Sequence, residues 1–207
     1  MKKIFIIAVA ALTLVACNKP SLKEQYTTLT QETEAKLDTI TDQTAYEALI
    51  DSYMTQVLDM YLDNIARSGA RVFYRLGNKI EHWPKHYGIM PPKDFKKWAV
   101  ICEHIIRHMN EGWANGHHRG IVYWEIWNEP DFNNKCWTGT PEEFFDLFEI
   151  TAKHLKSCFP EIKIGGPAVC RYNADWLIPF FEEMKKRNVP MDFYSWHCYS
   201  SKVEDFI

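Results

Sequence analysis

The stretch IVYWEIWNEPD, residues 121–131, decides which fold this sequence predicts. Residues 121–127 are apolar or aromatic except for Glu125, which is typical of a strand buried within a sheet. The run Asn-Glu-Pro-Asp follows at once, and residues of these types favour loops and turns. We therefore predict a strand over residues 121–127, with polar side chains directly after its end.

Strands and helices alternate on both sides of this stretch. Three further apolar segments, residues 71–76, 162–164 and 191–196, are predicted strands, and a predicted helix separates each strand from the next. Strands joined through helices run parallel with right-handed crossovers, so the pattern predicts an α/β fold. A doubly wound sheet and a (β/α)8 barrel both fit. The first strand is not followed by a Gly-rich phosphate loop, which argues against a nucleotide-binding sheet.

The helix predicted between the second and third strands has the clearest start. Thr140 suits the N-cap, Pro141 suits the first helical position, and Glu143 can complete a capping box. A longer helical pattern precedes the first strand, with apolar residues at three- and four-residue steps over residues 46–62. We divide the chain into a leader (1–16), a helical segment of unassigned role (17–66) and an α/β domain (67–207).

The N-terminus resembles a bacterial lipoprotein signal peptide. Lys2 and Lys3 precede an apolar stretch, residues 4–16, that is too short to span a bilayer as a helix. The stretch ends in the sequence LVAC, which is similar to a lipobox and implies cleavage before Cys17 and lipidation of its thiol. We then expect a lipid anchor in the bacterial cell envelope, facing the periplasm or the exterior. The alternative is an ordinary secretory signal in which Cys17 has no such role.

Composition and charge exclude several classes of function. The net charge of −3 gives no reason to expect a nucleic-acid partner. Besides Cys17 there are five cysteines at irregular spacing, which we interpret mostly as buried small hydrophobes with at most one or two disulfides. His104 and His108 share a predicted helix face, but residue 105 is Ile where a zinc hydrolase has Glu. We predict neither a metal nor a cofactor.

Chemistry in both candidate architectures lies at the C-terminal ends of the parallel strands. The side chains to consider therefore come directly after each predicted strand. They are Asn78, Glu81 and His82, then Asn128, Glu129 and Asp131, then Pro167, and finally His197 and Tyr199.

Several of these segments together are similar to glycoside hydrolase family 39, a clan A family that includes β-xylosidases and α-L-iduronidases. The similar segments are FYRLGN with IEH (73–78 and 80–82), WEIWNEPD (124–131), IGGPA (164–168) and WHCY (196–199). The resemblance covers about residues 70–200 and leaves out residues 21–62. It implies a partial (β/α)8 TIM barrel, about strands three to six, behind an α-helical N-terminal segment.

The resemblance assigns Glu129 as the acid/base of a retaining glycosidase and Asn128 as the contact to the sugar 2-hydroxyl. Such an acid must first protonate the leaving oxygen and then, ionised, take a proton from water. Loss of water around a carboxyl group disfavours its charged form, so a strand end among aromatic residues suits the acid. The alternative for this motif is a set of turn and helix-cap residues.

Five further residues are candidates for substrate binding. The resemblance places His197 and Tyr199 at the end of strand six, where they face the sugar or orient a carboxylate. Glu81 and His82 follow strand three, and Trp127 precedes the Asn128-Glu129 pair. Each could instead be a buried structural residue. Glu125 points to the same strand face as Trp127 and is as readily a structural charge as a catalytic one.

The resemblance also implies that the nucleophile of this mechanism is a Glu at the end of strand seven. The carboxylates that follow Tyr199 in this sequence are Glu204 and Asp205, in a polar tail directly behind strand six. We therefore expect a β-xylosidase-like glycosidase fragment that carries the acid/base half of the site, binds carbohydrate and lacks the nucleophile. The alternative is an inactive surface lipoprotein that binds glycan or only retains the fold. A third interpretation, a misassembled reading frame, rests on the loss of resemblance before about residue 65.

Overall fold

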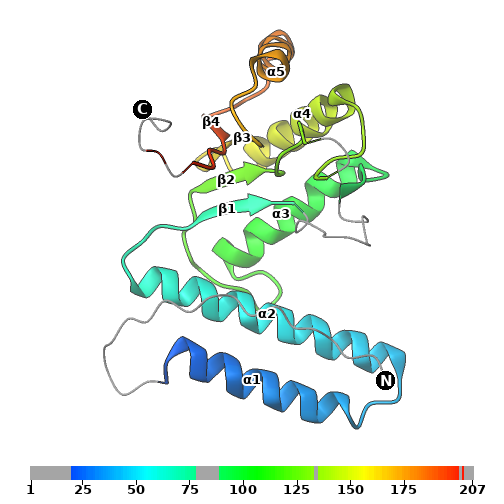
Figure 1. Cartoon of the computed structure of the whole chain (residues 1–207), viewed down its shortest axis with the longest axis vertical. Coiled ribbons are helices and arrows are strands. Elements are labelled where there is room, and N and C mark those ends of the chain that lie inside the picture. The colour runs from blue at the N-terminus through cyan, green and yellow to red at the C-terminus, as the bar shows by residue number, and fades with distance from the viewer. Residues whose placement is uncertain (1–19, 78–88, 133–134, 201, 203–207) are drawn as a thin grey trace. The chain divides into compact units, whose positions relative to one another are not determined.

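The computed structural model describes residues 20–77, 89–132, 135–200 and 202 (Figure 1). The chain divides into two compact units, Met1–Arg71 and Val72–Ile207. Each unit has its own core, and each is considered by itself. None of the described helices is long and apolar enough to cross a membrane.

The described part of the first unit consists of two helices that pack against each other, α1 (Leu22–Leu37) and α2 (Gln43–Arg67). Ser21 and Glu24 form a capping box at the start of α1, and the Asp42 side chain caps α2. Tyr53 of α2 is buried between the helices, and its hydroxyl lies 3.0 Å from Thr30 Oγ1 of α1. This unit contains helices where the sequence predicts them.

The second unit alternates strands and helices along the whole described chain. In order, its elements are β1 (Phe73–Leu76), α3 (Phe95–Glu111), β2 (Tyr123–Ile126), α4 (Pro141–Cys158), β3 (Lys163–Val169), α5 (Ala174–Lys186) and β4 (Phe193–Trp196). All neighbouring strands pair in parallel. The α/β alternation predicted from the sequence is therefore confirmed.

The order of the strands decides between the two architectures that fit the sequence. The strands lie side by side in chain order, β1-β2-β3-β4. A doubly wound sheet reverses its strand order at a switch point, whereas a barrel does not. The helices are also neighbours in chain order, because α3 packs on α4 and α4 packs on α5. The unit is a four-stranded part of a (β/α)8 barrel.

The third strand is longer than the sequence predicts. We expected it to end before Gly165, but it continues through Gly165, Gly166 and Pro167 to Val169. A Cβ atom on Gly165 would lie 2.1 Å from the backbone oxygen of Phe193 in β4. Gly165 is therefore a point of close approach between two strands, whereas sequence patterns treat glycine as a strand breaker.

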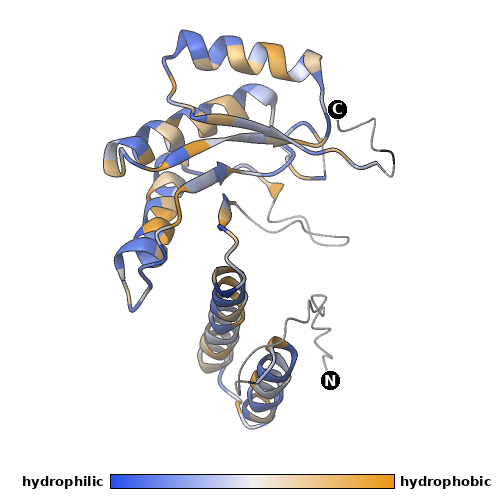
Figure 2. Cartoon of the chain, turned by 90° about the vertical axis from the view of Figure 1, so that its left-hand side faces the viewer, coloured by the Kyte–Doolittle hydropathy of each residue, from blue (hydrophilic) through white to orange (hydrophobic). Residues whose placement is uncertain are grey.

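One face of the sheet forms the core with the helices. Leu76, Trp124, Ile126 and Ile164 are fully buried there, together with aromatic rings of α4 and α5 such as Phe144, Phe148 and Phe180. The helices of this unit carry separate hydrophilic and hydrophobic bands (Figure 2), as expected for helices that cover one side of a sheet. The opposite face carries Arg75 and Glu125, which are paired in the β1–β2 register. That face leads to the candidate site.

Candidate active site

Backbone hydrogen bonds continue beyond the strand ends and hold the site residues together. The Trp127 amide donates to the Leu76 carbonyl (2.7 Å), and the Glu129 amide donates to the Ala168 carbonyl (2.9 Å). The His197 amide donates to the Val169 carbonyl (2.8 Å). Glu129 and His197 are thus both fixed to the last two residues of β3. This brings together two residues that are far apart in the sequence.

Three non-glycine residues at these strand ends have left-handed backbone conformations. The φ angles are 69° for Trp127, 48° for Glu129 and 54° for Ala168. Such a conformation costs about 1–2 kcal/mol for a residue with a Cβ atom. Conformations of this kind persist where the surrounding structure imposes them, and they cluster at functional sites. The strain supports a functional role for this edge of the sheet.

The Glu129 carboxyl group is buried and has a partner on each oxygen. The residue is 6% exposed, and its Oε1 lies 2.5 Å from His197 Nδ1. The Cys136 thiol donates to Oε2 at 3.6 Å. Burial and, secondarily, the charge of Glu129 raise the pKa of Cys136 to about 11. The thiol therefore stays protonated near neutral pH and acts as a weak donor to the carboxylate.

Arg75 joins three other side chains of the site. Its Nη1 donates to Asn128 Oδ1, and its Nη2 lies 3.1 Å from His197 Nε2. Its Nε donates to Glu125 Oε2 at 2.5 Å. Ser195 donates to the other oxygen of Glu125 at 2.6 Å, so both oxygens of this buried carboxylate are occupied. Among the described residues, Glu125 acts as an anchor for Arg75.

Arg75 determines which ring nitrogen of His197 carries the proton in the neutral imidazole. A guanidinium group donates hydrogen bonds and accepts none. His197 Nε2 must therefore accept from Arg75, and the proton is on Nδ1, which donates to Glu129. The same logic orients Asn128, since its oxygen accepts from Arg75 and its amide nitrogen donates one hydrogen to Cys136 Sγ at 3.7 Å, which leaves the second hydrogen of the amide for another acceptor.

Arg75 and Ser195 were not among the site residues predicted from the sequence. A charged residue inside the apolar strand segment FYRL is a signal that could have been used, because a charge that is partly withdrawn from water favours a partner. The partner could not be named from the sequence, since Arg75 and Glu125 are 50 residues apart and Glu125 and Ser195 are 70 apart.

The other predicted site residues are placed less closely together. Tyr199 is 83% exposed, and its ring centroid lies 6.0 Å from that of His197. Trp127 is buried, donates to the Cys136 carbonyl and packs against Trp98 and Trp137, so the structure gives it a packing role. A contact of either residue with sugar stays a prediction. Asn78, Glu81, His82 and Cys17 lie outside the described residues.

The Asp131 and Pro167 side chains belong to the frame of the site. Asp131 Oδ1 accepts from the Cys170 amide at 2.8 Å, which ties the loop after β2 to the end of β3. Burial raises the pKa of Asp131, partly offset by that hydrogen bond. Pro167 lies inside β3, where it pairs with Ser195.

The cysteines are not arranged as the sequence suggested, whereas His104 and His108 both contact Trp113, as expected for residues on one face of α3. The five cysteines of the described chain are all free, and only Cys102 and Cys136 are buried. The expectation that most of them are buried is therefore wrong, because Cys158 and Cys170, at a helix end and just after a strand end, are partly exposed and Cys198 is exposed. His104 stacks on Trp113, and His108 Nδ1 lies 3.0 Å from the Trp113 carbonyl.

A retaining glycosidase mechanism uses two carboxyl groups, and the described site places the buried Glu129 at the strand end. The two hydrogen-bond partners of its carboxyl group are the Cys136 thiol and the Nδ1–H of His197. Retaining glycoside cleavage needs a second carboxylate about 5 Å away. The other buried carboxylate in the described part of this unit is Glu125, and both its oxygens are occupied.

Curated relatives of this chain are β-xylosidases. The chain is 31% identical over 166 residues to a β-xylosidase of Geobacillus stearothermophilus, a match covering 77% of this chain and 31% of that protein. It is 35% identical over 121 residues to a β-xylosidase of Caldicellulosiruptor saccharolyticus, covering 57% of this chain and 24% of that protein. The chain therefore spans less than a third of the length of either relative.

Solved structures share the fold over about two thirds of this chain and less than a third of their own length. A glucosidase from Croceicoccus marinus matches with a TM-score of 0.60 at 28% identity, over 68% of this chain and 29% of that chain. A family 39 enzyme from Xanthomonas axonopodis pv. citri matches with a TM-score of 0.54 at 25% identity, over 70% and 29%.

The family model of the glycosyl hydrolases of family 39 matches residues 38–206. This match includes α2, which the sequence motifs left outside the resemblance. A helix is recognised by its apolar spacing and carries no strand-end motif, so motif comparison missed it. The resemblance therefore does not stop near residue 65. The misassembled-frame interpretation, which rested on such a stop, loses its support. By the extent of this match, the chain belongs to glycosyl hydrolase family 39.

Proposed function

We propose that this chain carries the acid/base half of the active site of a retaining, β-xylosidase-like glycoside hydrolase. The observation that carries the proposal is the Glu129 carboxyl group, buried at a strand end between the His197 Nδ1–H and the Cys136 thiol. The β-xylosidase relatives favour a xylose-containing substrate.

Glu129 performs two proton transfers in this mechanism. Protonated, it donates to the glycosidic oxygen as the bond to the leaving group breaks. Ionised, it takes a proton from the water that attacks the glycosyl-enzyme intermediate and so returns to its starting form. The Nδ1–H of His197 and the Cys136 thiol lie where they can donate hydrogen bonds to the ionised form.

Asn128 binds the sugar 2-hydroxyl through its amide nitrogen. Arg75 supports this role because it donates a hydrogen bond to the Asn128 oxygen. The Asn128 amide nitrogen therefore points away from Arg75. A hydrogen bond to the 2-hydroxyl strengthens as positive charge develops in the transition state. The nucleophile of the mechanism is a further carboxylate that the described strands do not supply.

We also propose that Cys17 is lipidated and that the protein is held at the bacterial cell envelope. The basic start, the short apolar stretch and the LVAC sequence support this proposal. In the alternative function, an envelope lipoprotein uses the same strand-end residues to bind glycan without cleaving it. Occupation of both Glu125 oxygens favours this alternative for the described residues taken alone.

The test of the acid/base role places residues 72–200 in a β-xylosidase that already supplies the nucleophile. In the Geobacillus relative, the matching segment is exchanged for that of this chain, and the chimera is compared with its Glu129→Gln form. Gln keeps the shape but cannot donate and recover a proton. Aryl xylosides with poor leaving groups should lose most of their rate, and those with good leaving groups much less.

The outcome that contradicts the assignment is an equal loss of rate on both classes of substrate. Glu182→Gln is the matched control, because Glu182 is an exposed carboxylate on α5. The binding-only alternative is tested on the chain itself by titration with xylobiose, followed through the side-chain amide signal of Asn128. Binding of xylobiose by the chain, together with a chimera that folds but does not hydrolyse xylosides, supports that alternative.

A further inference from the structure

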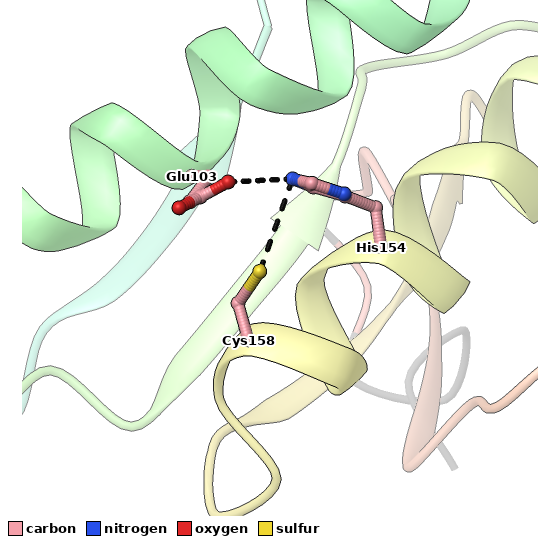
Figure 3. Close-up of side chains that lie close together, drawn as sticks. All are labelled: Glu103, His154 and Cys158. Atoms are coloured by element: carbon pink, nitrogen blue, oxygen red, sulfur yellow. Dashed lines mark hydrogen bonds and ion pairs between the residues drawn. The ribbon is translucent and has the colours of Figure 1, made fainter.

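Three potential metal ligands converge between helices α3 and α4. Glu103 lies on α3, whereas His154 and Cys158 lie one turn apart on α4, and the three side chains point toward one another (Figure 3). His154 Nε2 lies 2.7 Å from Glu103 Oε2 and 3.9 Å from Cys158 Sγ. All three ligand atoms lie within 4.8 Å of one another.

We propose that Glu103, His154 and Cys158 form a binding site for a borderline-soft divalent metal ion of the zinc class. A carboxylate, an imidazole and a thiolate are the ligand types that zinc uses. Calcium and magnesium prefer sets of oxygen ligands, so the His and Cys members argue against them.

The geometry distinguishes a metal site from a catalytic cysteine. A histidine that activates a thiol and is oriented by a carboxylate uses its two ring nitrogens for the two partners. Here the carboxylate and the thiol both approach the same nitrogen, Nε2. Convergence of all partners on one point is what coordination of a single ion requires.

An ordinary ion pair between the helices explains only part of the arrangement. It explains the contact of Glu103 with His154, but it does not explain why the Cys158 thiol is turned to the same ring nitrogen. The i, i+4 spacing places His154 and Cys158 on one face of α4, as two ligands from one helix must be.

Outer contacts hold Glu103 ready as a ligand. Its second oxygen, Oε1, accepts from Arg107 Nε at 2.8 Å, so Oε2 is left to face His154. Mainly because of the Arg107 hydrogen bond, the pKa of Glu103 is lowered, and the carboxylate is ionised near neutral pH. Metal ligands are commonly oriented by such secondary hydrogen bonds.

A zinc ion fits after small side-chain movements. Zinc bonds of about 2.0–2.3 Å in a tetrahedral arrangement place neighbouring ligand atoms roughly 3.3–3.7 Å apart. The Glu103–His154 contact must therefore open by about half an ångström, and the His154–Cys158 contact must shorten slightly. On binding, the thiol releases its proton to solvent, and His154 offers the Nε2 lone pair with its proton on Nδ1. The His154 side chain is 30% exposed, which leaves access for a water molecule as fourth ligand.

The test measures whether zinc protects Cys158 from alkylation in the purified, reduced and chelator-treated chain. Labelling is followed by mass spectrometry at Cys158 and at the exposed Cys198, which serves as an internal reference. At free zinc about ten times the dissociation constant, labelling of Cys158 should slow about tenfold, while Cys198 is unaffected. Cobalt(II) should add a thiolate-to-cobalt charge-transfer band that Cys158→Ser removes.

Two variants separate this site from adventitious binding by other histidines. His154→Gln should abolish protection of Cys158, whereas His108→Gln, which changes a histidine of α3 outside the proposed site, should leave it intact. The proposal is overturned if zinc fails to protect Cys158 up to millimolar concentration. It is also overturned if the zinc stoichiometry is unchanged in Cys158→Ser or is lost in His108→Gln. The labelling experiment on the wild-type chain tests the proposal without any variant. The proposal can therefore be decided even if one of the variants folds poorly.

Discussion

Replacing Glu125 by Gln should lower the free energy of unfolding of the Val72–Ile207 unit by about 2 kcal/mol. Glu125 is 3% exposed and accepts from Arg75 at 2.5 Å and from Ser195 at 2.6 Å. Gln keeps the shape and one acceptor oxygen, so one donor loses its partner and the attraction between opposite charges is lost.

The magnitude follows from the exposure of the partner. A hydrogen bond to a charged group contributes about 1.5–3 kcal/mol, and breaking a fully buried ion pair costs about 3–5 kcal/mol. The Arg75 side chain is 39% exposed and keeps its contacts to Asn128 and His197, so water and these partners compensate in part. The expected loss is therefore near the lower of the two ranges. With a urea m-value of about 1–3 kcal/mol/M, the unfolding midpoint should fall by roughly 1 M.

Tryptophan fluorescence during urea unfolding measures this loss in the relevant unit. All eight tryptophans follow Val72, so the signal does not report on α1 and α2. Glu182→Gln removes an exposed carboxylate of the same unit and should change stability by less than about 0.5 kcal/mol. A midpoint shift for Glu125→Gln no larger than that of this control would refute the reasoning. It would mean that Glu125 does not hold Arg75 in place.

Three other predictions concern the site and the anchor. In a 15N spectrum of the neutral imidazole, His197 should carry its proton on Nδ1, and Arg75→Met should produce a mixture of tautomers; an Nε2-protonated wild type would contradict the assignment. Residues 18–207 alone should not hydrolyse aryl xylosides, because Glu125, the other buried carboxylate in the described part of the unit, is held by Arg75 and Ser195 and cannot serve as the nucleophile, and turnover that depends on Glu129 would show that a nucleophile was missed. Cys17→Ser should move the protein from the membrane fraction to the soluble fraction, and unchanged partitioning would exclude lipid anchoring through this residue.

The local structure of the second unit could be predicted from the sequence because the signals are themselves local. The capping box of Thr140 and Glu143 forms at the start of α4 as its residue types indicate. The strand before Asn128 and the placement of Glu129 directly after it need only the apolar run and the loop residues that follow. For the same reason, the alternation of strands and helices was correct.

The tertiary structure alone decided which strands are neighbours and in which register they pair. The residue period of a strand shows which side chains share a face, but it does not show what lies opposite them. The chain-order sheet, which makes this unit part of a barrel, is a non-local property, as is the close approach that Gly165 permits. The contact of Arg75 with His197 joins residues 122 positions apart, and it sets the tautomer that turns an N–H toward Glu129. Sequence therefore determined that a carboxyl group and an amide stand at a strand end, whereas the packing of β1 and β4 beside β2 and β3 decided which proton donors face them.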